Sequence, residues 1–470
     1  MPKALSPRAT WNFVMTELFA KQALLPQGWR RNVQITIAAD GTFASLTPES
    51  TPGPDMQLLD MVVPPQISLH SHAFQRAMAG LAERRQNPDD TFWTWRTRMY
   101  QLAHRISPEQ MQDVAAFLYM QMLKAGYTQV AEFHYLHNAV DGRPYTSPAE
   151  MSSRVAAAAT DAGIGITLLP TLYARGGFDG SPLNDAQKRF ASTPDTIARI
   201  LSDLQSDWRG SQLVTAGIGL HSLRAVDIHT LGDLLHAAGP AAPIHIHIAE
   251  QQREVETCLS VTGQRPVEHL MSHLPVDARW CLVHATHLSA AEVTAIARSE
   301  AVAGLCPITE ANLGDGIFPF EAYVAQSGHF GIGSDSNVLL SPWEELRLLE
   351  YGLRLQSQKR CVALPPDHKG SIGAWLYRQS LAGGAQANGL PLSGLQPGAR
   401  ADLCVLDEQA LSLPDLQNDD ILDSAIFATS SPPVRHVMCA GQWRITDGYH
   451  PDEARLTRAF HATLRTLMAA

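Results

Sequence analysis

The sequence predicts an α/β protein: a (β/α)8 TIM-like barrel with a small β-sandwich domain built from both ends of the chain. Two observations indicate the barrel. Eight short apolar runs recur between residues 61 and 337, and amphipathic stretches separate most of them. A third observation indicates the small domain, because runs near both chain ends alternate apolar and polar residues around glycine turns.

The predicted barrel strands follow one another in an order that leaves room for a helix after most of them. The helical periodicity is clearest in SPEQMQDVAAFLYMQMLKAG (107–126), where we expect Ser107 to cap a helix and Glu109 to lie in its first turn. The eight runs cover residues 61–72, 127–135, 163–173, 213–226, 243–251, 279–288, 301–314 and 329–337.

The flanking segments are typical of short antiparallel strands. QITIAADGTFASLTP (34–48) alternates around an Asp-Gly turn, and GARADLCVLD and VRHVMCAGQWRITDGYH do the same near the C-terminus. We therefore expect a small β-domain from residues 1–62 and 388–450, a barrel from 63–387, and an amphipathic C-terminal helix from 451–470.

Composition narrows the class of partner. Hydrophobic residues make up 45% of the 470 residues, and the formal net charge of -10 contains no block of like charges. Such a surface does not attract nucleic acid or an anionic membrane. The start of the chain lacks a signal-peptide pattern, and no stretch approaches about 20 uninterrupted apolar residues. We expect a cytoplasmic protein that acts on a small molecule.

Polar side chains gather at the predicted strand ends, where barrels of this kind place their chemistry. His70 and His72 lie one residue apart after the first strand, His245 and His247 share one face of the fifth, and Asp335 ends the eighth. Taken singly, an HxH pair is usually not a metal site. Asp335 alone could equally cap the helix that follows it. Together these residues favour a catalytic metal ion with one open position for water. Strand spacing alone does not decide whether His245 or His247 is the ligand from the fifth strand.

Several motifs resemble those of the amidohydrolase superfamily, in an order that covers nearly the whole chain. These motifs are HSH (70–72), HIHIAE (245–250), LVHATH (282–287) and GIGSDSN (331–337). Within that superfamily, further stretches closely resemble the formimidoylglutamate deiminases. They are AFQRAMAGLAE (73–83), GLHSLRAV (219–226), HIHIAEQQREVE (245–256) and CPITEANLGDGIFP (306–319).

The resemblance implies a ligand set. The family's HxxE pattern matches His247 to Glu250, which makes His247 rather than His245 the ligand. The implied metal ligands are His70, His72, His247 and Asp335. The third and fourth strands contain no lysine that could be carboxylated to bridge two ions, so we expect one divalent ion, with zinc favoured over iron.

The resemblance also implies a reaction, the hydrolytic deimination of N-formimino-L-glutamate in histidine degradation. A metal lowers the pKa of its bound water from 15.7 to about 7, which makes the nucleophile available. We expect Asp335 to receive the proton of that water, His284 to orient it, and Glu250 to face the departing nitrogen. The sequence does not fix how proton transfer is divided among these three residues.

Substrate carboxylates require cationic and hydrogen-bonding partners, and the resemblance offers Gln75, Tyr135 and Arg224. A guanidinium can hold a carboxylate with two hydrogen bonds. Arg96, from a predicted lid over residues 91–100, is our choice for the second carboxylate. Without the family match, Arg224 would be interpreted as a surface arginine and Tyr135 as a packed rim aromatic.

Two alternatives remain beside this interpretation. One is a deaminase of the same superfamily that acts on a purine, pyrimidine or triazine ring, against which Arg224 argues. The other is a metal-free interaction protein on the same scaffold, which we would expect to have lost some of the four ligands. A homodimer is common among such barrels, and the sequence leaves the oligomeric state open.

Overall fold

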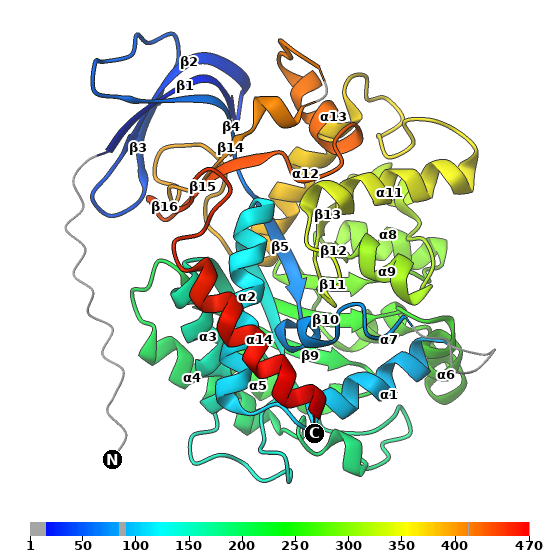
Figure 1. Ribbon diagram of the computed structural model, residues 1–470. Helices are drawn as coiled ribbons and strands as arrows, with labels where there is room; N and C mark the ends of the chain where they lie inside the picture. The colour runs from blue at the N-terminus through cyan, green and yellow to red at the C-terminus, as the bar shows by residue number, and fades with distance from the viewer. Residues whose placement is uncertain (1–15, 84–90, 412, 470) are drawn as a thin grey trace.

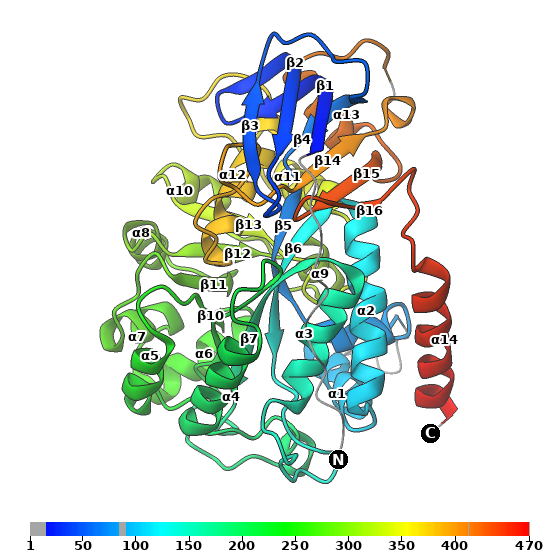
Figure 2. The same ribbon diagram turned by 90° about the vertical axis from the view of Figure 1, so that its left-hand side faces the viewer.

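The computed structural model describes residues 16–83, 91–411 and 413–469, which form a barrel with a smaller sheet packed over one end (Figure 1). Figure 2 shows the small sheet above the barrel, with helices arranged around the barrel strands. This confirms the predicted fold class. Within the described ranges, no helix combines the length and apolar character that crossing a bilayer requires.

The barrel is one sheet of parallel strands, and every hydrogen-bonded pair in it is parallel. The order β5-β6-β7-β9-β10-β11-β12-β13 follows the sequence, with β8 paired to β7 just before β9. The strands are β5 (Gln66–Ser71), β6 (Tyr127–His134), β7 (Gly165–Leu172), β8 (Val214–Ala216), β9 (Ile218–Ser222), β10 (Ile244–Ile248), β11 (Trp280–His284), β12 (Val302–Leu305) and β13 (His329–Ile332).

The first and last strands meet at their carboxyl ends and nearly close the barrel. Ser71 forms an isolated parallel bridge with Asp335. The Asp335 amide donates to the His70 carbonyl at 3.0 Å, and the His72 amide donates to the Asp335 carbonyl at 2.9 Å. Three residues predicted as metal ligands therefore lie on the hydrogen bonds that join β5 to the chain after β13.

Two predicted strands are each divided in the structure. The run 61–72 contains the end of β4 (Gln57–Val63), which belongs to the small sheet, and the whole of β5. Pro64 and Pro65 separate the two strands, since proline cannot donate a ladder hydrogen bond. The run 213–226 contains β8 and β9, which Gly217 separates.

The small sheet draws its strands from both ends of the described chain. Its order is β16-β15-β14-β4-β1-β2-β3, and an isolated antiparallel bridge joins Thr42, just before β3, to Arg400, just before β14. Its core contains apolar side chains from both chain ends, including Ile35 and Leu403. The residue limits of the domains stay a prediction. The strands are β1 (Thr16–Leu25), β2 (Gly28–Ile37), β3 (Phe43–Thr47), β4, β14 (Leu403–Leu406), β15 (Val434–Cys439) and β16 (Gln442–Ile445).

Helices cover the outside of the barrel. The expected cap of α2 is confirmed, because Ser107 Oγ accepts the Gln110 amide hydrogen at 3.2 Å and Glu109 lies in the first turn. The helices are α1 (Phe92–Ala103), α2 (Pro108–Ala125), α3 (Glu150–Ala162), α4 (Pro194–Asp207), α5 (Gly232–Ala238), α6 (Gln252–Thr262), α7 (Pro266–His273), α8 (Ala290–Arg298), α9 (Pro307–Leu313), α10 (Phe320–Val324), α11 (Pro342–Ser357), α12 (Ile372–Ala387), α13 (Asp419–Phe427) and α14 (Glu453–Ala469).

The C-terminal helix α14 lies alongside α2 in both views (Figures 1 and 2). Phe460 of α14 stacks on Phe117 of α2, with ring centroids 4.0 Å apart and an interplanar angle of 5°. Both rings are buried. The amphipathic C-terminal segment therefore packs on the barrel's outer layer.

Helix α12 packs on the seam between β5 and β13 through two glycines. A Cβ at Gly383 would fall well inside contact distance of the Phe330 carbonyl of β13, and one at Gly384 would crowd Ile67 of β5. The missing side chains let the helix backbone approach both strands. This close approach supports the seam that carries the predicted metal ligands.

Replacing Gly383 by alanine should destabilise the protein although alanine favours a helix, because the added methyl group meets rigid backbone. We expect a loss of about 1–3 kcal/mol, the usual cost of overpacking, measured as a lowered midpoint in thermal or urea unfolding. Gln379→Ala, at an exposed position of the same helix, is the matched control. An unchanged midpoint for Gly383→Ala would contradict this description of the seam.

Candidate metal centre and active site

Three histidines from two strands converge at the carboxyl end of the barrel. His70 and His72 come from the end of β5, and His247 comes from β10. Their ligand atoms all lie within 4.8 Å of one another, and all three side chains are buried. Alternation along β5 brings His70 and His72 to the same side, as the HxH spacing predicts.

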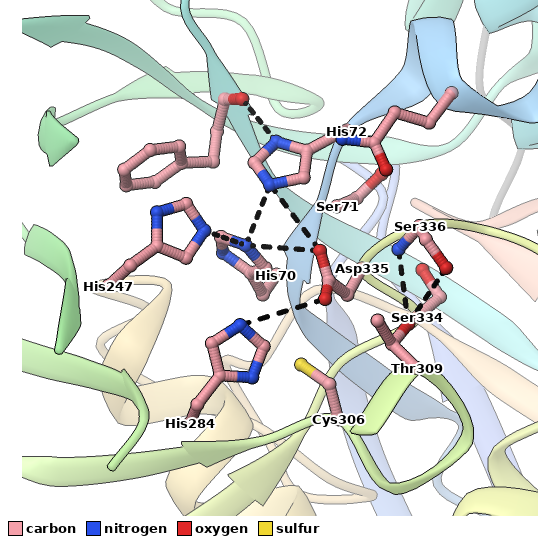
Figure 3. A network of polar contacts seen from close by, with 12 residues as sticks. His70, Ser71, His72, His247, His284, Cys306, Thr309, Ser334, Asp335 and Ser336 are labelled. Carbon is pink, nitrogen blue, oxygen red and sulfur yellow. Dashed lines mark hydrogen bonds and ion pairs between the residues drawn. The ribbon is translucent and has the colours of Figure 1, made fainter. Parts of the chain in front are cut away.

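The donor atoms lie close enough together to share a metal site. His70 Nε2 lies 3.2 Å from His72 Nε2 and 3.0 Å from His247 Nε2. Asp335 Oδ1 lies 3.5 Å from His70 Nε2 and 3.4 Å from His72 Nε2 (Figure 3). Atoms that each lie ~2.1 Å from one tetrahedral ion are roughly 3.4 Å apart. The four predicted ligands therefore fit a metal ion.

Backbone carbonyls orient two of the imidazoles. His72 Nδ1 lies 2.9 Å from the Phe133 carbonyl, and His247 Nδ1 lies 2.8 Å from the His221 carbonyl. A carbonyl only accepts, so each Nδ1 carries the hydrogen and each Nε2 presents its lone pair to the common point. Such outer partners are typical of histidine ligands.

His245 points elsewhere. Its Nε2 lies 2.7 Å from the Ala387 carbonyl at the end of α12, and the side chain is buried in the core. Of the two histidines that strand spacing left as alternatives, only His247 faces His70 and His72.

Burial keeps the three clustered imidazoles neutral. It lowers the pKa of His72 to about 3, and it lowers the pKa values of His70 and His247 well below 6.5 with a further contribution from neighbouring imidazoles. A neutral imidazole has a free lone pair, which is the form that binds metal. Burial also raises the pKa of Asp335 to about 7, whereas a nearby cation would favour its ionised form.

The strand ends adopt strained backbone around this point. Ala249, His284, Ala285 and Asp335 all have positive φ, between 42° and 67°. Such a conformation costs about 1–3 kcal/mol for each non-glycine residue and is common at functional sites. The Ala285 amide donates to the Ile248 carbonyl at 3.0 Å, which helps hold the turn after β11.

Two further titratable groups lie beside the histidine cluster. His284 Nε2 lies 3.7 Å from Glu250 Oε1 and 3.7 Å from Asp335 Oδ2. Burial alone would lower the pKa of His284, but Glu250 and neighbouring carboxylates outweigh it and raise the pKa well above 6.5. The arrangement therefore has groups that can take up and release protons beside the ion site.

A second group of potential ligands lies behind His284. His284, Cys306 and Glu310 bring three donor atoms within 4.8 Å of one another. Glu310 Oε1 already accepts the Cys306 amide hydrogen at 2.9 Å and lies 3.3 Å from His284 Nδ1. Sequence reasoning did not single out Cys306 or Glu310.

A cavity of about 50 Å³ opens from the metal centre. All four residues predicted to bind substrate line it, together with five of the six residues predicted for metal binding or proton transfer, which lie at its inner end. These lining residues are Gln75, Arg96, Tyr135, Arg224, His72, His247, Glu250, His284 and Asp335.

Two of the predicted substrate-binding residues bond to each other. Gln75, in the short helix Ala73–Met78, donates from Nε2 to the Tyr135 hydroxyl at 3.2 Å. Burial raises the pKa of Tyr135 well above 10, so its hydroxyl stays protonated. The pair presents neutral hydrogen-bonding groups to the cavity.

The two predicted arginines differ in their surroundings. Arg96 of α1 donates to the hydroxyls of Tyr100 at 2.5 Å and Tyr173 at 3.2 Å. Arg224 lies 5.8 Å from the Trp93 ring, and its buried Nε has no hydrogen-bond partner in the described part of the chain. Neither guanidinium forms an ion pair there, so both are available to an anion.

Sequence reasoning missed several cavity-lining residues. They are Phe92, Trp95, Met99, Tyr100, His221 and Leu313. Four of them belong to α1, so the segment predicted as a lid lines the cavity, and its role as a lid stays a prediction. The signal for His221 lay in the quoted motif GLHSLRAV, where Arg224 alone was singled out.

Two family models match the chain. The amidohydrolase family model matches residues 61–444. The model described as formimidoylglutamate deiminase HutF, N-terminal domain, matches residues 15–58. The two matches correspond to the barrel with its C-terminal strands and to the first strands of the small sheet.

Comparisons with individual proteins agree with the two family matches. The chain is 50% identical over 454 residues to a formimidoylglutamate deiminase of Pseudomonas aeruginosa, covering 97% of this chain and 100% of that protein. It is 46% identical to the crystal structure of an amidohydrolase from Brucella melitensis, with a TM-score of 0.92 over 96% of this chain and 100% of that one. A zinc-bound adenosine deaminase from Xanthomonas campestris, 20% identical over 97% of this chain and 99% of that one with a TM-score of 0.79, shares the fold. The chain therefore belongs to the amidohydrolase family and, within it, to the formimidoylglutamate deiminases.

Proposed function

We propose that this chain hydrolyses N-formimino-L-glutamate to N-formyl-L-glutamate and ammonia in histidine degradation. The observation that carries the proposal is the polarity of one cavity. Its inner end holds the metal centre and carboxylates, which suit a cationic formimino group, and its wall holds Arg96 and Arg224, neither of which forms a close ion pair in the described part of the chain. The identity to a formimidoylglutamate deiminase supports the same reaction.

For the cofactor we propose one divalent ion, zinc in preference to iron, held by His70, His72, His247 and Asp335. Imidazole and carboxylate ligands suit zinc. Strands β7, β8 and β9 contain no lysine that could be carboxylated to bridge a second ion. The bound ion would supply a water of lowered pKa and polarise the trigonal carbon's substituent.

The chain's own groups would move the protons. Asp335 Oδ2 and His284 Nε2, 3.7 Å apart, can take up and hold the proton released when water attacks the C=N carbon. Glu250, on the other side of His284, is placed to pair with the cationic formimino group and to protonate the departing amine. The product ammonia takes the nitrogen, and water supplies the carbonyl oxygen.

The substrate's two carboxylates would bind at the opposite wall. Arg224 has unsatisfied donor capacity and a planar fork that matches one carboxylate. Arg96 is our choice for the second, with Tyr135 and Gln75 as neutral hydrogen-bonding partners. A neutral purine, pyrimidine or triazine ring would leave both guanidiniums unpaired in a partly buried cavity.

A cytoplasmic location and a small-molecule partner fit such a metabolic reaction, and we include both in the proposal. A homodimer stays a prediction.

Ligation and proton transfer can be separated by mutation. Glu250→Gln and His284→Asn should keep the ion but lower kcat by about 10²-fold or more, the usual scale for losing an acid-base group. His72→Ala should lose the ion and the activity together. Metal content by elemental analysis and steady-state kinetics check both statements. Loss of metal from the Glu250 or His284 variant would mean that the residue is a ligand.

Arg224→Ala tests the substrate. We expect kcat/KM for N-formimino-L-glutamate to fall by a factor that corresponds to a loss of about 2–4 kcal/mol of transition-state stabilisation, as for a charge-assisted bidentate contact. A formimino compound without carboxylates should react slowly with the wild type and lose little more in the variant. Arg253→Ala is the matched control, since Arg253 also lies over Trp93, at 5.0 Å, but does not line the cavity.

Ammonia release is measured beside guanine and cytosine as competing substrates. A nucleobase that reacts better than N-formimino-L-glutamate would contradict the proposed function. Equal effects of Arg224→Ala and Arg253→Ala would contradict the role of Arg224 as a carboxylate partner.

A further inference from the structure

We propose that Glu310 is a positioning residue that orients the His284 ring for proton transfer. The inference rests on the proposed function, because it assigns a role within the same reaction. Glu310 does not line the cavity, so it would act through His284 rather than on the substrate.

The geometry places one carboxylate oxygen between two donors. Glu310 Oε1 accepts the Cys306 backbone hydrogen at 2.9 Å and lies 3.3 Å from His284 Nδ1. Glu310 lies in the first turn of α9 and is only 7% exposed. The backbone contact holds this oxygen in place at the end of β12, next to the strand that carries His284.

The contact with Glu310 determines which ring nitrogen of His284 faces the reaction. A carboxylate accepts hydrogen bonds, so the Nδ1 that faces it carries the hydrogen. Nε2 is then directed to Glu250 and Asp335, each 3.7 Å away. Figure 3 shows one His284 nitrogen on the line to Asp335 while the other points away from the histidine cluster. Without Glu310, the ring could turn over or adopt the other tautomer.

A simpler role for Glu310 is to satisfy backbone amides at the start of α9. The structure contains a matched case of that role alone. Glu345 of α11 is fully buried, and its Oε2 accepts the Ile308 backbone hydrogen at 2.9 Å in the same first turn. Glu345 has no hydrogen bond or ion pair with His284 in the described ranges. Comparing the two glutamates therefore separates positioning of His284 from support of the helix.

The test uses the metal-loaded full-length protein and N-formimino-L-glutamate. We expect Glu310→Ala to lower kcat by about 10²-fold or more with KM within about threefold of wild type and one ion retained, since binding groups are untouched. Glu345→Ala should lower the melting temperature but keep kcat within about threefold. Glu310→Gln should recover most of the rate, because its amide oxygen can accept both hydrogen bonds.

Three results would overturn the proposal: equal kcat losses in the two alanine variants, no recovery in Glu310→Gln, or loss of the ion from Glu310→Ala, which would indicate a ligand. In Glu310→Asp the shorter side chain moves the carboxylate oxygen away from His284, so kcat should fall as in Glu310→Ala. If Glu310→Ala does not fold, this variant tests the proposal in its place. Wild-type protein that fails to release ammonia from this substrate would instead contradict the proposed function.

Discussion

Three buried imidazoles bring their Nε2 atoms to one point, and the lone pairs of His72 and His247 there favour a cation between them. His70 Nε2 is 3.2 Å from His72 Nε2 and 3.0 Å from His247 Nε2, and carbonyls behind two of these rings hold the lone pairs inward. The carboxylate of Asp335 completes the set. Since the His72 and His247 rings cannot turn away without leaving a buried Nδ1 unpaired, a bound metal stabilises the arrangement.

The fold brings these residues together by parallel strand pairing. Parallel strands place their carboxyl ends at one face, and the β5–β13 seam puts Asp335 beside His70 through backbone hydrogen bonds. The α12 glycines let a helix pack closely on that seam. The same face carries α1, whose side chains line the cavity. Positive charge on the cavity wall and carboxylates at its inner end then give the site a polarity that matches a substrate with a cationic head and two anionic groups.

Much of this was predictable from the sequence, and the exceptions have physical reasons. Apolar runs located all eight barrel strands, but apolar content does not reveal pairing partners, so β4 and β5 were merged across Pro64-Pro65. Period-two spacing put His245 and His247 on one face, and the carbonyl of Ala387 that separates their roles comes from a distant helix. Glu310 lies in the motif CPITEANLGDGIFP but was not singled out, because its contact with His284 is tertiary and leaves no local signal. The position of α1 beside the cavity also depends on tertiary contacts, which the sequence does not reveal.

X-ray diffraction from crystals of the metal-loaded protein, recorded on both sides of the zinc absorption edge, tests the central claim most directly. The account predicts one anomalous peak per chain, at about 2.0–2.2 Å from Nε2 of each of the three histidines and from a carboxylate oxygen of the fourth ligand. Those ligands are His70, His72, His247 and Asp335. Two peaks, or a single peak held by His284, Cys306 and Glu310, would contradict it.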